Sequence, residues 1–166
     1  MQVKYLNEEV LYTEQEFVSL SSFDMDFLKK KAVKNRRKRI RLCAHKNLQE
    51  AVHEMIIVHT NDAYVRPHKH LRRCESFHVI EGIADVIIYD DKGNPLETIK
   101  IGDYNSGRNF YCRIPQAYFH SLIIRSDFLV FHETTQGPFD KTDTVFASWA
   151  PSEEDSIQIE AFKRRL

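Results

Sequence analysis

Residues 68–82 read HKHLRRCESFHVIEG and hold two histidines, a glutamate and a glycine at the spacing His-x-His-x4-Glu-x6-Gly. Alternate residues of a β-strand point to the same face, so His68 and His70 are expected to project together. The odd separation from His70 to Glu75 requires a break in register, which residues 71–74 can supply. Imidazole and carboxylate groups suit divalent iron, manganese, nickel, zinc or copper, so this spacing predicts a metal site.

A fourth ligand is expected from His120, which follows Pro115 in the segment IPQAYFH and can return on a later strand. Three histidines and one glutamate on a six-coordinate ion leave up to two positions for water, substrate or dioxygen, the open arrangement of a catalytic metal. The alternative is a strand with solvated histidines and a surface glutamate. The metal interpretation assigns a divalent ion, of unknown identity, to His68, His70, Glu75 and His120.

Short strands are predicted from residue 38 onward, because apolar and aromatic residues recur between turn segments such as DDKGNP at 90–95. The predicted strands cover residues 38–42, 52–59, 63–70, 75–80, 83–90, 96–101, 109–114, 120–125 and 128–134. A helical region is predicted over residues 13–34, where Thr13-x-x-Glu16 is a capping-box signature. Another short helix can follow Pro151. Such regular strands indicate a sandwich or barrel, and a double-sheet jelly roll would enclose a metal.

The metal-ligand spacing resembles the first motif of the cupin superfamily, G-x5-H-x-H-x3-4-E-x6-G, with Asp62 in place of the leading glycine. The second cupin motif, G-x5-P-x-G-x2-H-x3-N, is matched at Pro115 and His120. Three positions depart from the second motif: Asn109 and Ala117 replace its glycines, and Ile124 replaces its asparagine. These departures put the position of His120 in question.

Four further strings resemble the WbuC family of cupin-fold metalloproteins: RIRLCAH at 39–45, YVRPHKH at 64–70, GPFD at 137–140 and FASWAP at 146–151. The resemblance implies a mainly β fold, a double-stranded β-helix (cupin jelly roll) with a short N-terminal helical segment. We therefore expect an N-terminal helical extension over residues 1–37, a cupin β-barrel domain over 38–152 and a C-terminal tail over 153–166. The resemblance also implies a bacterial protein of O-antigen or other lipopolysaccharide biosynthesis.

Three more side chains are candidates for chemistry. Arg66 shares a predicted strand face with His68 and His70, so it could grip a phosphate or carboxylate, although a structural ion pair is the alternative. Glu133 stands where the resemblance places a family glutamate, and it is the candidate general base or ligand-orienting group; a buried ion pair is the alternative. Tyr64 could donate a proton, although strand packing is the simpler interpretation.

Composition favours neither disorder nor binding to polyanions, because 29% of the 166 residues are charged and the formal net charge is zero. One segment, KKKAVKNRRKRIR at 29–41, holds nine basic residues but no interleaved aromatic residues for base stacking, so no nucleic-acid partner is expected. The acidic residues that precede this segment could neutralise it. In the alternative, a few of its arginines bind a substrate phosphate.

The protein is expected to be cytoplasmic, because no apolar run approaches the roughly 20 residues of a membrane span and the N-terminus lacks a signal peptide's apolar core. Its three cysteines, Cys43, Cys74 and Cys112, have no framework spacing and are expected to be reduced thiols. Jelly rolls often pair through sheet edges, so a homodimer is expected.

The expected function is that of an enzyme acting on a carbohydrate or sugar nucleotide, as a metal-dependent sugar isomerase or epimerase in O-antigen or other surface-polysaccharide biosynthesis. Two alternatives are an iron-dependent oxygenase and a non-catalytic protein that binds or senses a small molecule through its metal. A third is a closed structural metal site.

Overall fold

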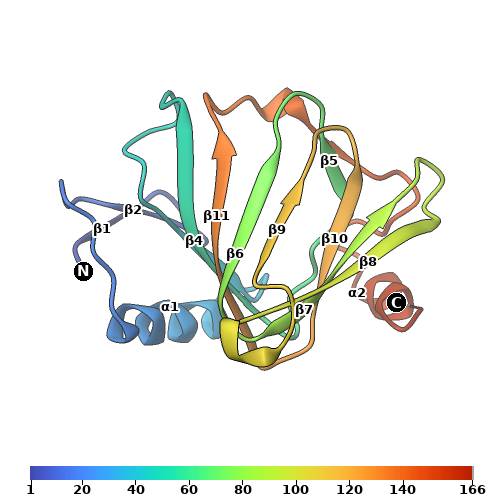
Figure 1. Ribbon diagram of the computed structural model, residues 1–166, viewed down its shortest axis with the longest axis horizontal. Helices are drawn as coiled ribbons and strands as arrows, with labels where there is room; N and C mark the ends of the chain where they lie inside the picture. The colour runs from blue at the N-terminus through green and yellow to red at the C-terminus, as the bar shows by residue number, and fades with distance from the viewer. Residues whose placement is uncertain (166) are drawn as a thin grey trace.

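Two β-sheets face each other in the computed structural model, which describes residues 1–165 (Figure 1). The larger sheet has the strand order β1 (Val3–Tyr5), β2 (Val10–Thr13), β3 (Arg39–Cys43), β4 (Val52–Thr60), β11 (Phe128–Gln136), β6 (Glu75–Glu81) and β9 (Tyr111–Ile114). The smaller sheet has the order β12 (Thr144–Phe146), β5 (His68–His70), β10 (Phe119–Ile124), β7 (Ile83–Tyr89) and β8 (Pro95–Gly102). All pairings are antiparallel except that of β2 with β3. This is the two-sheet jelly roll that the sequence predicts.

Each of the nine predicted strands is present as β3 to β11, although the segment 63–70 is extended only over its last three residues. Three short strands were missed: β1 and β2, which add to the edge of the larger sheet beside β3, and β12, which pairs with β5. Short 3-10 helices at Tyr104–Ser106 and Lys141–Asp143 lie in the connections before β9 and β12.

The N-terminal helix is shorter than predicted. Residues 10–13 belong to β2, and the helix α1 spans Ser22–Lys34. Its capping box joins Ser21 and Asp24, whose carboxylate accepts hydrogen bonds from the Ser21 backbone N–H and hydroxyl. The Thr13-x-x-Glu16 signature is therefore wrong as a helix start, because Thr13 ends a strand paired to Val3.

Residues of β3 and β4 alternate between the two faces of the sheet, so these strands pack against α1 on one face and against the interior on the other. Ile40, Leu42 and Val58 turn outward from the sheets and pack with Leu28 of α1 in one apolar cluster. Met55 turns the other way, into the main core between the two sheets, with a set of aliphatic and aromatic residues from eight other strands. The larger sheet is thus covered on both faces, by α1 outside and by the smaller sheet inside.

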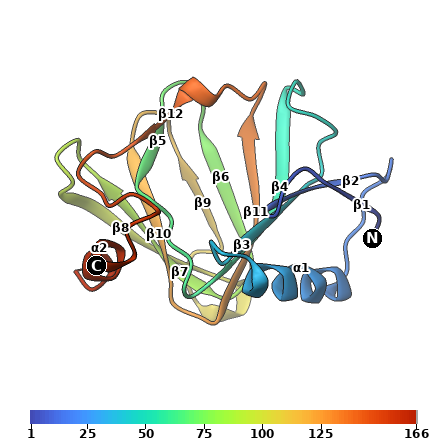
Figure 2. The same ribbon diagram turned by 180° about the vertical axis from the view of Figure 1, so that it is seen from behind.

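The smaller sheet is covered on its outer face by the C-terminal segment. Tyr89 and Phe119 pack there with Ala147, Ala150 and Trp149. The short C-terminal helix α2 (Ser156–Lys163) follows, as the sequence suggests, and lies on the opposite side of the molecule from α1 (Figure 2).

Within residues 1–165, no helix combines the length and the apolar character needed to cross a membrane. The three cysteines are all free thiols; Cys43 and Cys112 are buried and Cys74 is partly exposed.

The tight β6–β7 turn depends on Gly82, which has a φ of +87°. A Cβ at this position would lie 2.0 Å from the carbonyl oxygen of Phe128 and 2.6 Å from Ser126 Oγ. We expect Gly82→Ala to lower the free energy of unfolding by more than about 3 kcal/mol, since a left-handed backbone alone costs an L-residue about 1–2 kcal/mol.

Gly107 is the matched control, because it also has a positive φ, of +73°, but its Cβ position is surrounded by open space. Gly107→Ala should therefore cost only about 1–2 kcal/mol. Urea denaturation of both variants measures the difference, and similar losses at the two positions would contradict this account of the turn.

Candidate metal centre and cavity

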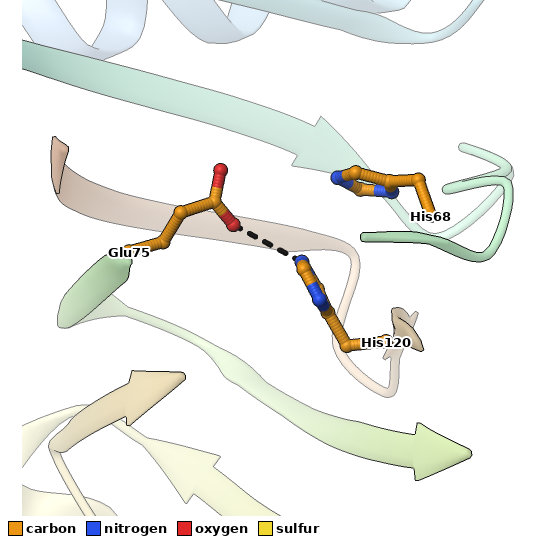
Figure 3. Close-up of side chains that lie close together, drawn as sticks. All are labelled: His68, Glu75 and His120. Atoms are coloured by element: carbon orange, nitrogen blue, oxygen red, sulfur yellow. Dashed lines mark hydrogen bonds and ion pairs between the residues drawn. The ribbon is translucent and has the colours of Figure 1, made fainter. Parts of the chain in front are cut away.

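Three of the four predicted ligands converge: His68, Glu75 and His120 each offer a ligand atom, and these atoms lie within 4.8 Å of one another (Figure 3). His68 on β5 and His120 on β10 are direct partners in the smaller sheet. Glu75 begins β6 in the larger sheet and reaches across from the facing side. The register break expected at residues 71–74 is therefore a crossing from one sheet to the other.

Backbone carbonyls orient both histidine rings. His68 Nδ1 lies 2.8 Å from the carbonyl oxygen of Arg66, and His120 Nδ1 lies 3.1 Å from that of Tyr118. A ring that donates from Nδ1 to a carbonyl leaves its Nε2 lone pair available to a metal, which is the usual arrangement of metal-binding histidines. His120 Nε2 is 3.0 Å from Glu75 Oε2. His68 is therefore held with its Nε2 available to an ion, whereas His120 would exchange its hydrogen bond to Glu75 for a bond to the same ion.

The ionisation of two of these groups suits metal binding. Burial by itself would raise the pKa of Glu75, but its contacts with His120 and His70 hold that pKa well below the usual value. Burial lowers the pKa of His68 to about 3. The pKa of His120 is lowered by burial but raised further by the hydrogen bond to Glu75, and the net shift is upward. Near neutral pH the site thus offers a carboxylate and a neutral imidazole, the forms that bind metals.

His70, the fourth predicted ligand, lies beside this group. Its Nε2 is 2.7 Å from Glu75 Oε1, yet the atom is buried and makes no hydrogen bond of acceptable geometry. Its Nδ1 lies 3.1 Å from Thr144 Oγ1. A buried, orphaned Nε2 next to a carboxylate is unfavourable without a partner, and a divalent ion would supply that partner. The donor set of three imidazoles and one carboxylate fits the divalent ions predicted above.

The departures from the second cupin motif do not displace His120. Ala117 adopts a φ of +67°, the left-handed conformation that the glycine of the motif would take, and its N–H donates to the carbonyl of His70 at 2.7 Å. Alanine carries a strain that glycine would not, but the turn is kept. Ile124 is buried in the main core at the end of β10. His120 therefore reaches the site through an altered turn.

A cavity of about 380 Å³ between the sheets contains the metal-ligand group. Glu133 on β11 lines this cavity, and its neighbour His132 does not, as strand alternation predicts. Burial, and then the negative charge of Glu75, raise the pKa of Glu133 to about 8. A carboxyl group that exchanges a proton near neutral pH thus lies in the same cavity as the predicted ligands.

Arg66 and Tyr64 differ from the prediction in their surroundings. Arg66 precedes β5 rather than lying on it, but its side chain lines the cavity and stacks over the Phe146 ring at 5.2 Å. Tyr64 is absent from the cavity lining. Its hydroxyl donates to the carbonyl of Pro151 at 3.1 Å, and burial raises its pKa to about 12. The structure therefore does not bring Tyr64 to the site, and it gives no support to a proton-donor role.

The basic segment is neutralised only in part: within residues 1–165, three of its nine basic residues, Lys29, Arg37 and Arg39, form ion pairs. Of the acidic residues that precede the segment, Glu9 takes part. Arg37 and Arg39 each form ion pairs with Glu9 and with Glu153. All four of these side chains line the cavity. Arg41 also lines the cavity but makes no ion pair with residues 1–165.

Arg73 and Asp143 lie beside His70 and were not identified from the sequence. Asp143 is 4% exposed, and its Oδ2 lies 3.2 Å from Arg73 Nε. Arg73 Nη2 in turn contacts His70 Nδ1 at 3.2 Å and Thr144 Oγ1 at 3.1 Å. Both residues lie in segments that the sequence marks only as connections, so no local signal identified them.

Comparison with known proteins supports the fold. A family model described as a domain of unknown function (DUF6016) matches residues 20–101, just under half of the chain. No curated protein matches. Among solved structures, the chain is similar to the Shewanella oneidensis protein SO0799, with 13% identity and a TM-score of 0.53, over 74% of this chain and 76% of that one.

Two other solved structures are also similar. The capsular polysaccharide assembling protein CapF of Staphylococcus aureus is 18% identical, with a TM-score of 0.51, over 64% of this chain and 29% of CapF. Streptomyces PAC13, solved with uridine, is 10% identical, with a TM-score of 0.51, over 71% of this chain and 88% of PAC13. The chain spans 21–29% of the longer similar structures. The structural neighbours are cupin-fold proteins. The chain has a cupin fold, and at these identities the likeness extends to the fold alone.

Proposed function

We propose that this protein is a metal-dependent enzyme that isomerises or epimerises a carbohydrate or sugar nucleotide in the assembly of a bacterial O-antigen or other surface polysaccharide. The observation that carries the proposal is the placement of Glu133 in the same cavity as His68, Glu75 and His120. The polysaccharide context is supported by the resemblance to the WbuC family and by the fold shared with CapF, a capsular polysaccharide assembling protein. The fold shared with a uridine-bound PAC13 is compatible with a nucleotide-linked sugar.

In this proposal, His68, His70, Glu75 and His120 would hold a divalent ion, which would supply Lewis-acid polarisation of a sugar carbonyl or hydroxyl. For an isomerisation, Glu133 takes a proton from the carbon beside that carbonyl and returns it, on the same face, to the former carbonyl carbon. For an epimerisation, water on the opposite face would supply the new proton, and Glu133 would release its own to solvent. Burial raises the pKa of Glu133, which makes its carboxylate a stronger base than an exposed one.

Incubation in deuterated water tests the proton transfer. We expect the protein to exchange a carbon-bound hydrogen of its sugar substrate for deuterium, observed by proton NMR across a panel of sugar phosphates and sugar nucleotides. Glu133→Gln should lower the rate of exchange by about 10²- to 10⁴-fold, the usual contribution of a general base, and should leave the metal content unchanged.

His132→Gln is the matched control, because His132 is adjacent on β11 but lies outside the cavity lining. It should exchange at the wild-type rate. Equal rates for wild type and Glu133→Gln would remove Glu133 from the proposal, and substrate binding with no exchange or conversion would favour a non-catalytic binding protein.

A further inference from the structure

Two arginines that line the cavity form no ion pair with any residue of the described chain, 1–165. The cavity lining includes five arginines: Arg37, Arg39, Arg41, Arg66 and Arg73. Three of them are paired, Arg37 and Arg39 with Glu9 and Glu153, and Arg73 with Asp143. Across residues 1–165, no carboxylate oxygen lies within the 4.0 Å of an ion pair from Arg41 or Arg66.

Arg66 is held in place but keeps unused donors. Its guanidinium stacks on the Phe146 ring, and Nη2 donates to the carbonyl of Ala147 at 3.1 Å. Its Nε is buried and has no hydrogen-bond partner in the part of the chain that the structure describes. The Phe146 ring centroid is also 6.0 Å from that of His68. The Phe146 ring therefore lies close to both the Arg66 guanidinium and His68 of the metal-ligand group.

Arg41 is placed in the opposite wall by the alternation of β3. Ile40 and Leu42 face α1, so Arg41 faces into the cavity. The hydrogen bond it makes there is from Nη1 to the sulfur of Met55, at 3.8 Å. A thioether is a weak acceptor, so the five N–H donors of this guanidinium are largely unused.

A part-buried guanidinium without a counter-charge is unfavourable, and a planar fork of donors matches the oxygens of a phosphate or carboxylate. The cavity volume of about 380 Å³ is near the lower end of the usual range for ligand pockets, roughly 300–1,000 Å³. A monosaccharide with one anionic group fits this space, whereas a whole sugar nucleotide is considerably larger and would extend beyond it.

We propose that the cavity binds a monosaccharide-sized anion, with its phosphate or carboxylate group held by Arg41 and Arg66 and its hydroxyl or carbonyl oxygens facing His68, Glu75 and His120. This inference rests on the proposed function for the carbohydrate part of the ligand. It narrows the substrate class from sugars in general to sugar phosphates or sugar acids.

Isothermal titration calorimetry of the purified protein with glucose 6-phosphate, glucuronate and glucose tests the inference. At least one of the two anions should bind, and more tightly than neutral glucose; the tighter of the two identifies phosphate or carboxylate as the bound group. Arg41→Met and Arg66→Met should each weaken that binding by about 10- to 100-fold, since hydrogen bonds to charged groups are the strong ones. Metal content should not change.

Arg113→Met is the matched control, because Arg113 is exposed on β9 and its substitution removes the same charge without touching the cavity. It should bind as the wild type does. Arg41→Lys keeps a charge at the site if the methionine variant fails to fold, and it should bind more tightly than Arg41→Met but less tightly than the wild type, because it loses the planar fork.

Three results would overturn the inference: glucose binding as tightly as both anions, folded arginine variants binding like the wild type, or neither anion binding at millimolar concentration. If glucose binds as tightly as both anions, the proposed carbohydrate function still holds, because that result refutes only the need for an anionic group on the ligand. Conversely, anion binding by a protein that takes up no metal would support the arginine pair and refute the proposed function.

Discussion

His120→Ala is expected to weaken the binding of a divalent transition-metal ion by at least about 100-fold. Changing a residue that merely supports a metal ligand commonly costs 10- to 100-fold in affinity, so the loss of a direct ligand should reach or exceed the upper limit. His120 is 3% exposed, and its Nε2 lies 3.0 Å from Glu75 Oε2. Competition with a chromophoric chelator, using cobalt or zinc, gives the affinity of each variant.

The control for this experiment is His78→Ala. His78 is on β6, three residues after Glu75, but its side chain is exposed and it is not in the metal-ligand group. Its replacement should leave the affinity at the wild-type value. Undiminished affinity in a folded His120→Ala protein, verified by circular dichroism, would remove His120 from the shell.

The second large effect concerns stability in acid and depends on His59. This residue is 6% exposed, its ring packs against Phe131 at 5.6 Å, and its Nδ1 has no hydrogen-bond partner. Burial, and then the positive charges of Arg41 and Arg37, lower its pKa from the model-compound value of 6.5 to about 3. Between these two values the unfolded chain binds a proton at this position and the folded protein does not.

The free energy of unfolding must therefore fall as the pH drops below 6.5. One pKa unit corresponds to about 1.4 kcal/mol, so His59 should contribute a loss of about 3 kcal/mol between pH 7 and pH 4. The variant His59→Leu lacks this proton-binding site, so its stability should fall by that much less over the same range.

Urea denaturation at several pH values measures the difference between wild type and His59→Leu. His78→Leu is the control, because it removes an exposed histidine on β6 and should follow the wild-type pH dependence. Parallel stability curves for wild type and His59→Leu between pH 7 and pH 4 would show that His59 is protonated in the folded protein.

The sequence was sufficient to predict the strands of both sheets from β3 to β11, because short runs of apolar and aromatic residues recur there between turn residues. It was not sufficient for β2. This strand pairs in parallel with β3 in the register Val10 to Arg41, 31 positions later, so long-range pairing determines it. The Thr13-x-x-Glu16 signature then competed with the true helix start at Ser21.

The candidate site could be predicted in part for a similar reason. His68, His70 and Glu75 are adjacent in one motif, and the Pro115 turn indicates His120. Arg41 gives no such signal, since it ends a run of basic residues that is typical of a solvated segment. Its inward direction follows from α1 covering the other face of β3, which is a property of the tertiary structure.

Elemental analysis by mass spectrometry, on protein purified without a histidine tag or chelator, tests the central claim most directly. The wild type should contain about one equivalent of a divalent transition metal, and His70→Ala should lose it. The identity of the metal also separates Lewis-acid chemistry from the oxygen chemistry of an iron enzyme. A wild-type protein that contains no metal and takes up none on reconstitution would contradict the account.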